Sequence, residues 1–125
     1  MSTSSRKAGP QFLKYVAPVV QALQALGGSG RPAEVIDWIA SELNVSDQEQ
    51  AEMLGSGQSR FANQVHWSRF YLAKAGYIDA AERGVWSLTT KGLSAELDRD
   101  DVLAIFHQVQ DGLRETSGEP VPVPS

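Results

Sequence analysis

The chain has 125 residues, 42% of them hydrophobic, and a formal net charge of −4 at pH 7. This length suits one domain with its own hydrophobic core. The absence of cysteine excludes disulfides, thiol nucleophiles and cysteine zinc sites, and no apolar run reaches the ~18 residues of a membrane span. No apolar stretch follows the N-terminal charges as in a secretory signal, so we expect a soluble cytoplasmic protein without a membrane partner.

Apolar residues with helical spacing predict two helices in the first third of the chain. The first lies between residues 12 and 26, ends at a Gly-Gly pair and has Pro18 in its first turn or at a kink, so its regular part starts near Ala17. The second follows Pro32, a residue that suits the first turn of a helix.

Helix-end signals predict two further helices. Ser46 and Glu49 have the spacing of a capping box, which predicts a short helix ending near residue 54. A longer helix is expected from about Gln58 to Ala75, because the apolar period continues there until Gly76.

The period of the apolar residues then changes to that of strands. Short β-type runs at 77–79 and 85–88 surround a polar turn with Gly84 and predict a small hairpin. Thr89 or Thr90 is expected to cap the turn that follows. A last amphipathic helix has an apolar stripe formed by Val102, Ile105, Phe106, Val109 and Leu113.

These elements predict a fold that is mainly α with a small β-hairpin. Their order is that of a winged helix-turn-helix, with an extra helix between the second and recognition helices and a C-terminal amphipathic helix. We expect a flexible tail at 1–10, the winged-helix domain at 11–95, the C-terminal helix at 96–115 and a Pro-rich linker-like tail at 116–125. A linker at the end of the chain suggests a former second domain or a piece of a longer protein.

The helix expected at 58–75 has polar side chains where a groove contact would need them. On a helical wheel its apolar stripe faces one way, and the polar residues of its first half face the other way, with Gln64 at the edge. Arg, Asn and Gln bond base edges in the DNA major groove, and Ser bonds phosphate. With an arginine at the wing tip, the predicted DNA-binding residues are Ser59, Arg60, Asn63, Gln64, His66 and Arg83.

The charge around this helix favours the same interpretation. Residues 57–94 have five basic and two acidic side chains, a net of +3 in a chain whose remainder carries −7. A phosphate backbone senses charge within a Debye length of about 10 Å rather than the average over the chain. The alternatives are an ordinary scatter of charges and polar side chains that are merely solvated.

Two segments, "RFANQVHWSRFYLAKAGYI" and "RGVWSLTTKG", give the chain a family resemblance. Over about residues 12–95 it resembles the N-terminal winged-helix domain of Mrr-type restriction endonucleases. The resemblance implies a module that binds double-stranded DNA, in a family that joins it to a separate nuclease domain. The sequence departs from that family because it contains no nuclease domain. The extra helix near residue 50 also replaces the tight turn of simple helix-turn-helix proteins.

No catalytic or metal site is expected, and neither is a cofactor. The two histidines, His66 and His107, are far apart in the sequence, and no Gly-rich phosphate loop carries a lysine. One acidic cluster precedes the last helix, where charge stabilisation of a helix N-terminus explains it. Its members are Glu96, Asp98, Asp100 and Asp101.

Two other functions remain open at this stage. The chain could be a protein-interaction or dimerisation module, with a homodimer formed through the C-terminal helix. It could also be the specificity subunit of a split restriction nuclease, with a separate nuclease subunit as its partner. A DNA-binding dimer is compatible with the leading hypothesis, because symmetric sites are read by symmetric dimers.

Overall fold

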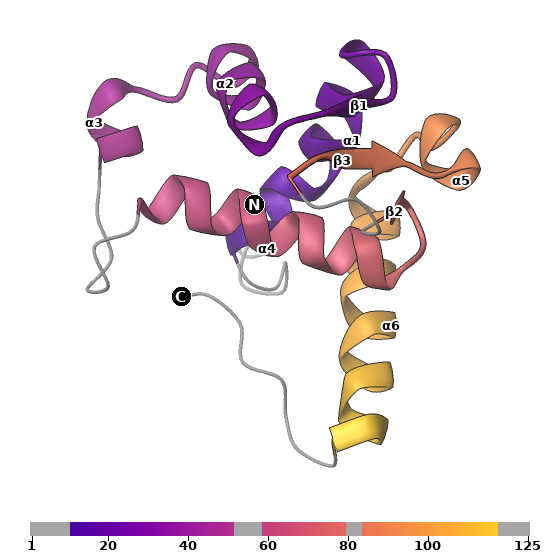
Figure 1. Ribbon diagram of the computed structural model, residues 1–125. Coiled ribbons are helices and arrows are strands. Elements are labelled where there is room, and N and C mark those ends of the chain that lie inside the picture. The colour runs from indigo at the N-terminus through magenta and orange to yellow at the C-terminus, as the bar shows by residue number, and fades with distance from the viewer. Residues whose placement is uncertain (1–10, 52–58, 80–83, 118–125) are drawn as a thin grey trace.

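A computed structural model describes residues 11–51, 59–79 and 84–117 of the chain (Figure 1). Within these ranges the fold is mainly α with a small antiparallel sheet, which confirms the predicted fold class. The elements are the 3-10 helix η2 (Gln11–Tyr15), α1 (Val16–Ala25), β1 (Ser29–Gly30), α2 (Pro32–Glu42), α3 (Asp47–Ala51), α4 (Arg60–Lys74), β2 (Ile78–Asp79), β3 (Trp86–Leu88), α5 (Thr90–Leu93) and α6 (Arg99–Ser117).

Proline and glycine set the ends of the first two helices, as predicted. Pro18 lies in the first turn of α1, where its missing N–H leaves no helical hydrogen bond unmade. At the other end of α1, the Gly28 N–H donates to the Leu23 carbonyl at 2.7 Å. α2 begins at Pro32, and the residue before it donates its backbone N–H to the Glu34 carboxylate at 2.9 Å.

The capping box predicted for α3 is present, and α4 begins with a cap of its own. The Glu49 N–H donates to the Ser46 hydroxyl at 3.0 Å, so α3 forms where the capping box indicated. Its expected end at residue 54 lies outside the described residues. Ser59 caps α4, and after Lys74 the chain turns at Gly76, whose φ of 91° is in the left-handed region that glycine favours.

The sheet includes a strand that the sequence did not reveal. The predicted hairpin is present, with β2 and β3 paired so that Ile78 lies opposite Leu88. On its other side β3 pairs with β1, which gives three strands in the order β1-β3-β2. In the sequence this Gly-rich segment indicates only the end of a helix, because two residues are too few to display the alternation of a strand.

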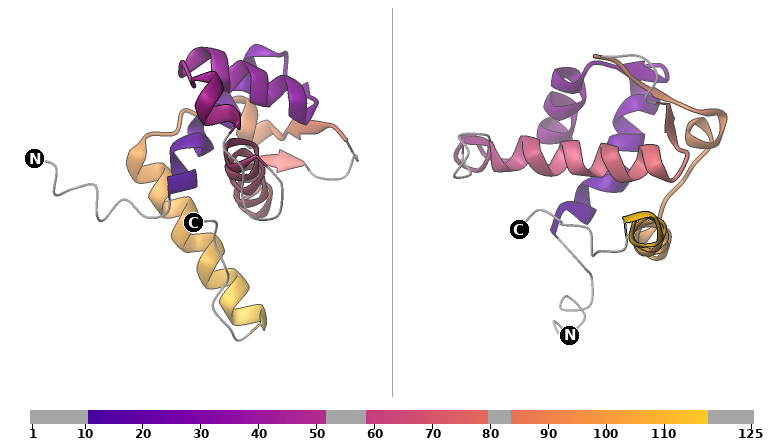
Figure 2. Two further views of the ribbon diagram at one scale, coloured as in Figure 1. Left: turned by 90° about the vertical axis from the view of Figure 1, so that its left-hand side faces the viewer. Right: turned by 60° about the horizontal axis from the view of Figure 1, so that its bottom comes forward.

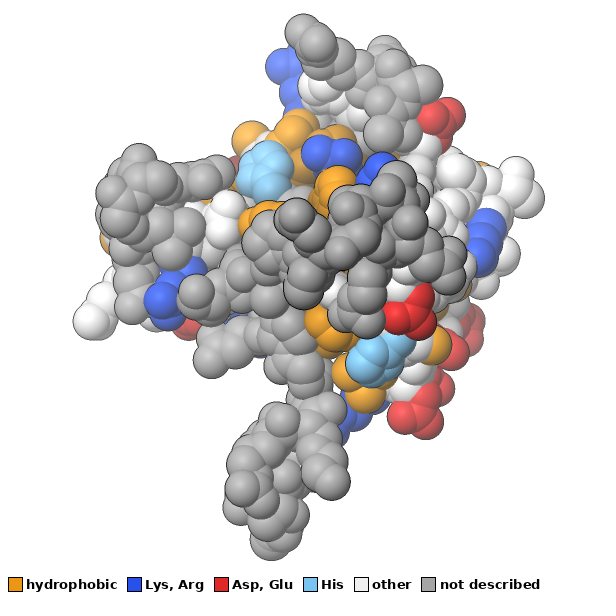
Figure 3. Space-filling model, turned by 90° about the horizontal axis from the view of Figure 1, so that it is seen from below, with side chains coloured by type: hydrophobic (Ala, Val, Ile, Leu, Met, Phe, Trp, Pro, Cys, Tyr) orange, Lys and Arg blue, Asp and Glu red, His pale blue; other side chains and the backbone are white. Residues whose placement is uncertain are grey.

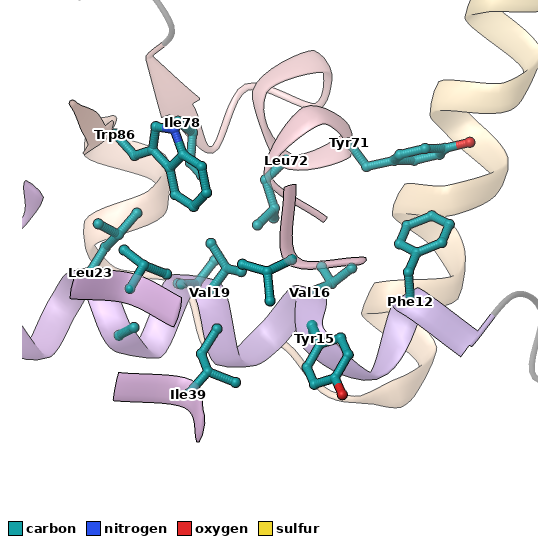
Figure 4. Packing of buried hydrophobic residues seen from close by; sticks show 14 of the residues in the cluster. Phe12, Tyr15, Val16, Val19, Leu23, Ile39, Tyr71, Leu72, Ile78 and Trp86 are labelled. Carbon is teal, nitrogen blue, oxygen red and sulfur yellow. The ribbon is translucent and has the colours of Figure 1, made fainter. Parts of the chain in front are cut away.

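The hydrophobic core runs along α1, from the sheet at one end to α6 at the other (Figure 4). Val16 and Val19 of α1 are at most 1% exposed and lie in the middle of the cluster. Phe12 and Tyr71 lie at one end of it and Trp86 at the other. α4 packs against both η2 and α1, so one side of this helix faces the core.

α6 packs against the same core near the second half of α4 (Figures 1 and 2). Val102, Ile105 and Val109 of its apolar stripe are each at most 8% exposed. The Phe106 ring stacks on Tyr71, with centroids 5.6 Å apart and an angle of 20° between the rings. The stripe that suggested a homodimer is therefore buried within the chain as far as Val109, and the homodimer stays a prediction.

Candidate nucleic-acid interface

α4 has a buried side and an outward side. Phe61, Val65 and Leu72 are at most 3% exposed and belong to the core. Asn63 and His66 lie on the other side of the helix and keep part of their surface exposed. Seen from below, the molecule carries basic, histidine and hydrophobic side chains next to one another, while acidic side chains gather on one flank (Figure 3).

Ser59, at the start of α4, makes hydrogen bonds within the fold that a helical wheel cannot show. Its hydroxyl accepts a hydrogen bond from the Ala62 N–H at 3.3 Å and donates one to the Gln50 carbonyl at 2.9 Å. These bonds cap α4 and fix it to the end of α3. Because a hydroxyl has one hydrogen, Ser59 could donate to a phosphate only by giving up its bond to Gln50.

The predicted position of Gln64 at the edge of the outward side is wrong. Its side chain is only 4% exposed. The physical reason is that η2 packs beside α4 and widens the buried sector beyond the apolar stripe. Ser68, one turn later, is 0% exposed and donates its hydroxyl hydrogen to the Phe12 carbonyl at 2.9 Å. Gln64 is consequently not available to a base edge in this arrangement.

Arg60 and Asn63 keep the partial exposure that a contact surface requires. The Nε atom of Arg60 is shielded from solvent and has no hydrogen-bond partner. The Asn63 side chain has no hydrogen bond among the described residues, although its backbone N–H donates to the Ser59 carbonyl at 2.9 Å. Both side chains therefore retain hydrogen-bonding groups that the fold itself does not use.

The structure adds Arg69 to this surface, next to His66 and to Trp86 of strand β3. The His66 ring meets Trp86 edge-on, with centroids 5.3 Å apart, and the Arg69 guanidinium carbon lies 5.6 Å from the Trp86 ring centroid. The spacing of three residues between His66 and Arg69 was the only signal in the sequence. The predicted wing-tip contact, Arg83, lies outside the described residues.

His66 has an environment that disfavours its charged form. Burial lowers the pKa of His66 below its ordinary value of 6.5, and the positive charge of Arg69 lowers it further. The imidazole is therefore neutral at pH 7 and offers one donor and one acceptor. That combination suits the edge of a base better than the charge of a phosphate.

The stability of the fold should decrease in mild acid because of His66. Its pKa is lowered in the folded chain and close to 6.5 in the unfolded chain, so the unfolded chain binds more protons between these two values. The free energy of unfolding should thus decrease as the pH falls below about 6.5 and through the folded pKa. Urea unfolding of the wild type and His66→Gln at pH about 7.5 and about 5.5 measures this loss.

His66→Gln should lose less stability than the wild type between these two pH values. The substitution His107→Gln, at an exposed position of α6, controls for the removal of an imidazole as such. An equal acid-dependent loss in the wild type and His66→Gln would contradict the expectation.

Other kinds of site are less well supported. Within residues 11–51, 59–79 and 84–117, no group of three or more His, Asp or Glu side chains is arranged to hold a metal ion. Asp98 and Asp101 each accept a hydrogen bond from the other's backbone N–H, at 2.8 and 3.1 Å respectively, and so cap α6. No helix in the described part of the chain is long and apolar enough to cross a membrane.

Comparison with known proteins gives matches over the same part of the chain. The family model described as the Mrr N-terminal domain matches residues 12–96, which include all elements from α1 to α5. The chain is 29% identical over 83 residues to the type IV methyl-directed restriction enzyme EcoKMrr of Escherichia coli (strain K12). That match covers 66% of this chain but only 27% of the enzyme. No solved structure matches the chain significantly.

Proposed function

Because the chain belongs to the Mrr N-terminal domain family, we propose that it is a non-catalytic module that binds double-stranded DNA in a restriction system. The observation that carries this proposal is the outward side of α4, where Arg60 and Asn63 retain unused hydrogen-bonding groups. We assign the activity of that restriction enzyme to the part of it that the match does not cover.

The arrangement around α4 supports a winged-helix mode of binding. The hairpin formed by β2 and β3 follows α4 directly, and β3 also pairs with β1 behind it. In this mode α4 enters the major groove and the hairpin acts as the wing beside it. A helix of 15 residues is about 22 Å long, enough to cross the groove with two turns to spare for packing.

Each polar side chain has a chemical role in this mode. Asn63, near the middle of the outward side, suits a bidentate contact with adenine, and Arg60 suits guanine or a phosphate. Neutral His66 adds a donor and an acceptor beside them. Arg83 remains a proposed contact of the wing tip. We place the module in the cytoplasm, where its DNA would lie, with a nuclease subunit as a further proposed partner.

Binding of duplex DNA should be measurable and should weaken as salt is added. Fluorescence anisotropy with a CpG-methylated duplex and its unmethylated counterpart, at about 50 and about 200 mM salt, tests this expectation. Methylated DNA belongs in the test because the relative is named a methyl-directed enzyme. A site selected from a random duplex library then allows Asn63→Ala to be tested, which should reduce discrimination by about 1–3 kcal/mol.

One control variant makes the result specific to the outward side of α4. Gln108→Ala, at an exposed position of α6, removes an amide of the same kind away from the proposed surface and should leave the discrimination unchanged. The proposed function would be abandoned if neither duplex bound at the lower salt concentration. If Asn63→Ala and the wild type discriminated equally between sequences, the proposal that α4 binds in the major groove would be wrong.

A further inference from the structure

We propose that Arg69 is a second DNA-contacting arginine, and that Arg60 and Arg69 bind phosphates on opposite strands of the major groove. This inference rests on the proposed function and adds to it a contact residue and an orientation of α4. The sequence alone assigned Arg60 to the surface and gave Arg69 no role. The structure brings Arg69 to the side of α4 that faces β3.

The first argument is the geometry of an i, i+3 row. Arg60, Asn63, His66 and Arg69 are each three residues apart, and such rows run at about 45° to a helix axis. Over these nine residues the row advances about 13.5 Å along α4 and turns by about 180° around it. The two arginines therefore leave the helix on opposite sides, with Asn63 and His66 between them.

The separation of the two arginines along and around α4 matches the dimensions of the DNA major groove. The major groove is about 12 Å wide and has a phosphate backbone on each wall. A helix that lies in the groove with Asn63 and His66 toward the base edges would direct one arginine to each wall. Asn63 and neutral His66 would then meet uncharged base edges, and the two charged side chains would meet charged phosphates.

The second argument is that each of the two guanidinium groups has an Nε atom without a hydrogen-bond partner. The Nε atoms of Arg60 and Arg69 are the two side-chain atoms in the described residues that are shielded from solvent and have no hydrogen-bond partner. Such atoms are uncommon in folded proteins, where buried donors are nearly always bonded. Both residues are also partly exposed, so each can meet a phosphate with the rest of its planar group.

Trp86 gives Arg69 a fixed position. The guanidinium carbon lies 5.6 Å from the ring centroid, within the range of a cation–π contact. Trp86 is 7% exposed and belongs to β3, so its ring is held by the sheet. An arginine that is already ordered loses less conformational entropy when it binds a phosphate.

The test compares the salt dependence of duplex binding among charge variants. Arg69→Gln removes the charge but keeps a stem and a planar amide for packing on Trp86, and Arg60→Gln is its counterpart. The slope of log K against log salt is negative, and it should become less steep by about 0.9 for each variant and by about 1.8 for the double variant. Arg69→Lys should restore the slope, and Arg99→Gln, at an exposed position of α6, is the charge control. Thermal unfolding verifies that each variant is folded.

A duplex with neutral methylphosphonate linkages throughout one strand tests the two-strand arrangement. On a duplex without a selected site, α4 can lie in either direction, and in each direction one arginine faces the neutral strand. The wild type should thus lose about one phosphate contact, and each single variant should bind this duplex with the same slope as the wild type. If both arginines contacted the same strand, the wild type would bind the charged strand with both, and the single variants would still have smaller slopes.

The possible outcomes distinguish a failure of the proposed arginine contacts from a failure of the proposed DNA-binding function. Wild-type binding with an unchanged slope in Arg69→Gln, but a smaller one in Arg60→Gln, would overturn the role of Arg69 and leave the DNA-binding function intact. Smaller slopes of the single variants on the half-neutral duplex would overturn the two-strand arrangement. Absence of wild-type binding would overturn both the function and the inference.

Discussion

Replacing Tyr71 with alanine should lower the free energy of unfolding by about 3–5 kcal/mol, the range for truncation of a large buried aromatic side chain. Tyr71 is 0% exposed, and its ring lies 5.0 Å from that of Phe12 on η2. On the other side it stacks against Phe106 of α6. The substitution thus removes contacts that join three helices at once. Urea unfolding followed by circular dichroism measures the loss.

Tyr71→Phe is the matched control for this prediction. It keeps the ring and removes the hydroxyl oxygen, which accepts a hydrogen bond from the Gln110 side-chain amide at 2.8 Å. Gln110 is buried, so its amide loses this partner in the variant, and we expect a loss of about 1–3 kcal/mol. A loss in Tyr71→Ala no greater than that in Tyr71→Phe would show that the ring does not hold the three helices together.

This aromatic cluster explains how one helix can belong to the core in its second half and keep polar side chains partly exposed in its first half. Trp67, Phe70 and Tyr71 contact one another in the second half of α4, and Trp67 and Tyr71 also contact Phe12. Through Trp67 and Tyr71 the cluster packs on η2, and through Tyr71 it also packs on Phe106 of α6, so it seats the second half of the helix. The first two turns of α4 have fewer large side chains, which leaves the polar side chains Arg60 and Asn63 partly exposed there.

The sequence predicted local features well, because their causes lie within a few residues. The capping box of Ser46 and Glu49, the start of α2 at Pro32 and the turn at Gly76 each depend on a single turn of chain. The period change after Gly76 likewise located the hairpin. These signals were sufficient for the fold class and for most helix ends.

Features that depend on distant partners could not be predicted. β1 exists because Gly30 pairs with Trp86, far along the chain. Gln64 is buried because η2 packs beside α4, and a helical wheel gives the direction of a side chain but not the width of the buried sector. Arg69 became a candidate only through its contact with Trp86. Tertiary packing thus decided which polar residues of α4 remain candidates for binding.

Replacing Gly92 with alanine should also cause a large loss of stability, about 1–3 kcal/mol or more. A methyl group at this position would overlap the Tyr77 carbonyl oxygen and lie 2.9 Å from Leu88 Cδ2. The carbonyl belongs to the backbone, so it cannot rotate away as a flexible side chain would. The Gly92 carbonyl also accepts a hydrogen bond from the Gln24 side chain at 3.1 Å, which joins α5 to α1.

Gly112→Ala is the matched control, because it introduces the same methyl group into the long helix α6. Nothing lies within 4 Å of a methyl group there, and alanine is favoured over glycine in a helix by about 0.5–1 kcal/mol. This variant should thus be as stable as the wild type or slightly more stable. Equal unfolding free energies for Gly92→Ala and the wild type would show that the backbone at Tyr77 can move without cost.

The clash expected in Gly92→Ala also gives a test of the proposed DNA binding. The Tyr77 carbonyl accepts a hydrogen bond from the Thr89 N–H at 3.0 Å, and Tyr77 directly precedes β2. A displacement of this carbonyl would therefore shift the hairpin relative to α4. If the hairpin is the wing, Gly92→Ala should weaken duplex binding below its unfolding temperature, while Gly112→Ala should not. Anisotropy titrations of both variants at a temperature where thermal unfolding shows them folded distinguish this effect from a simple loss of stability.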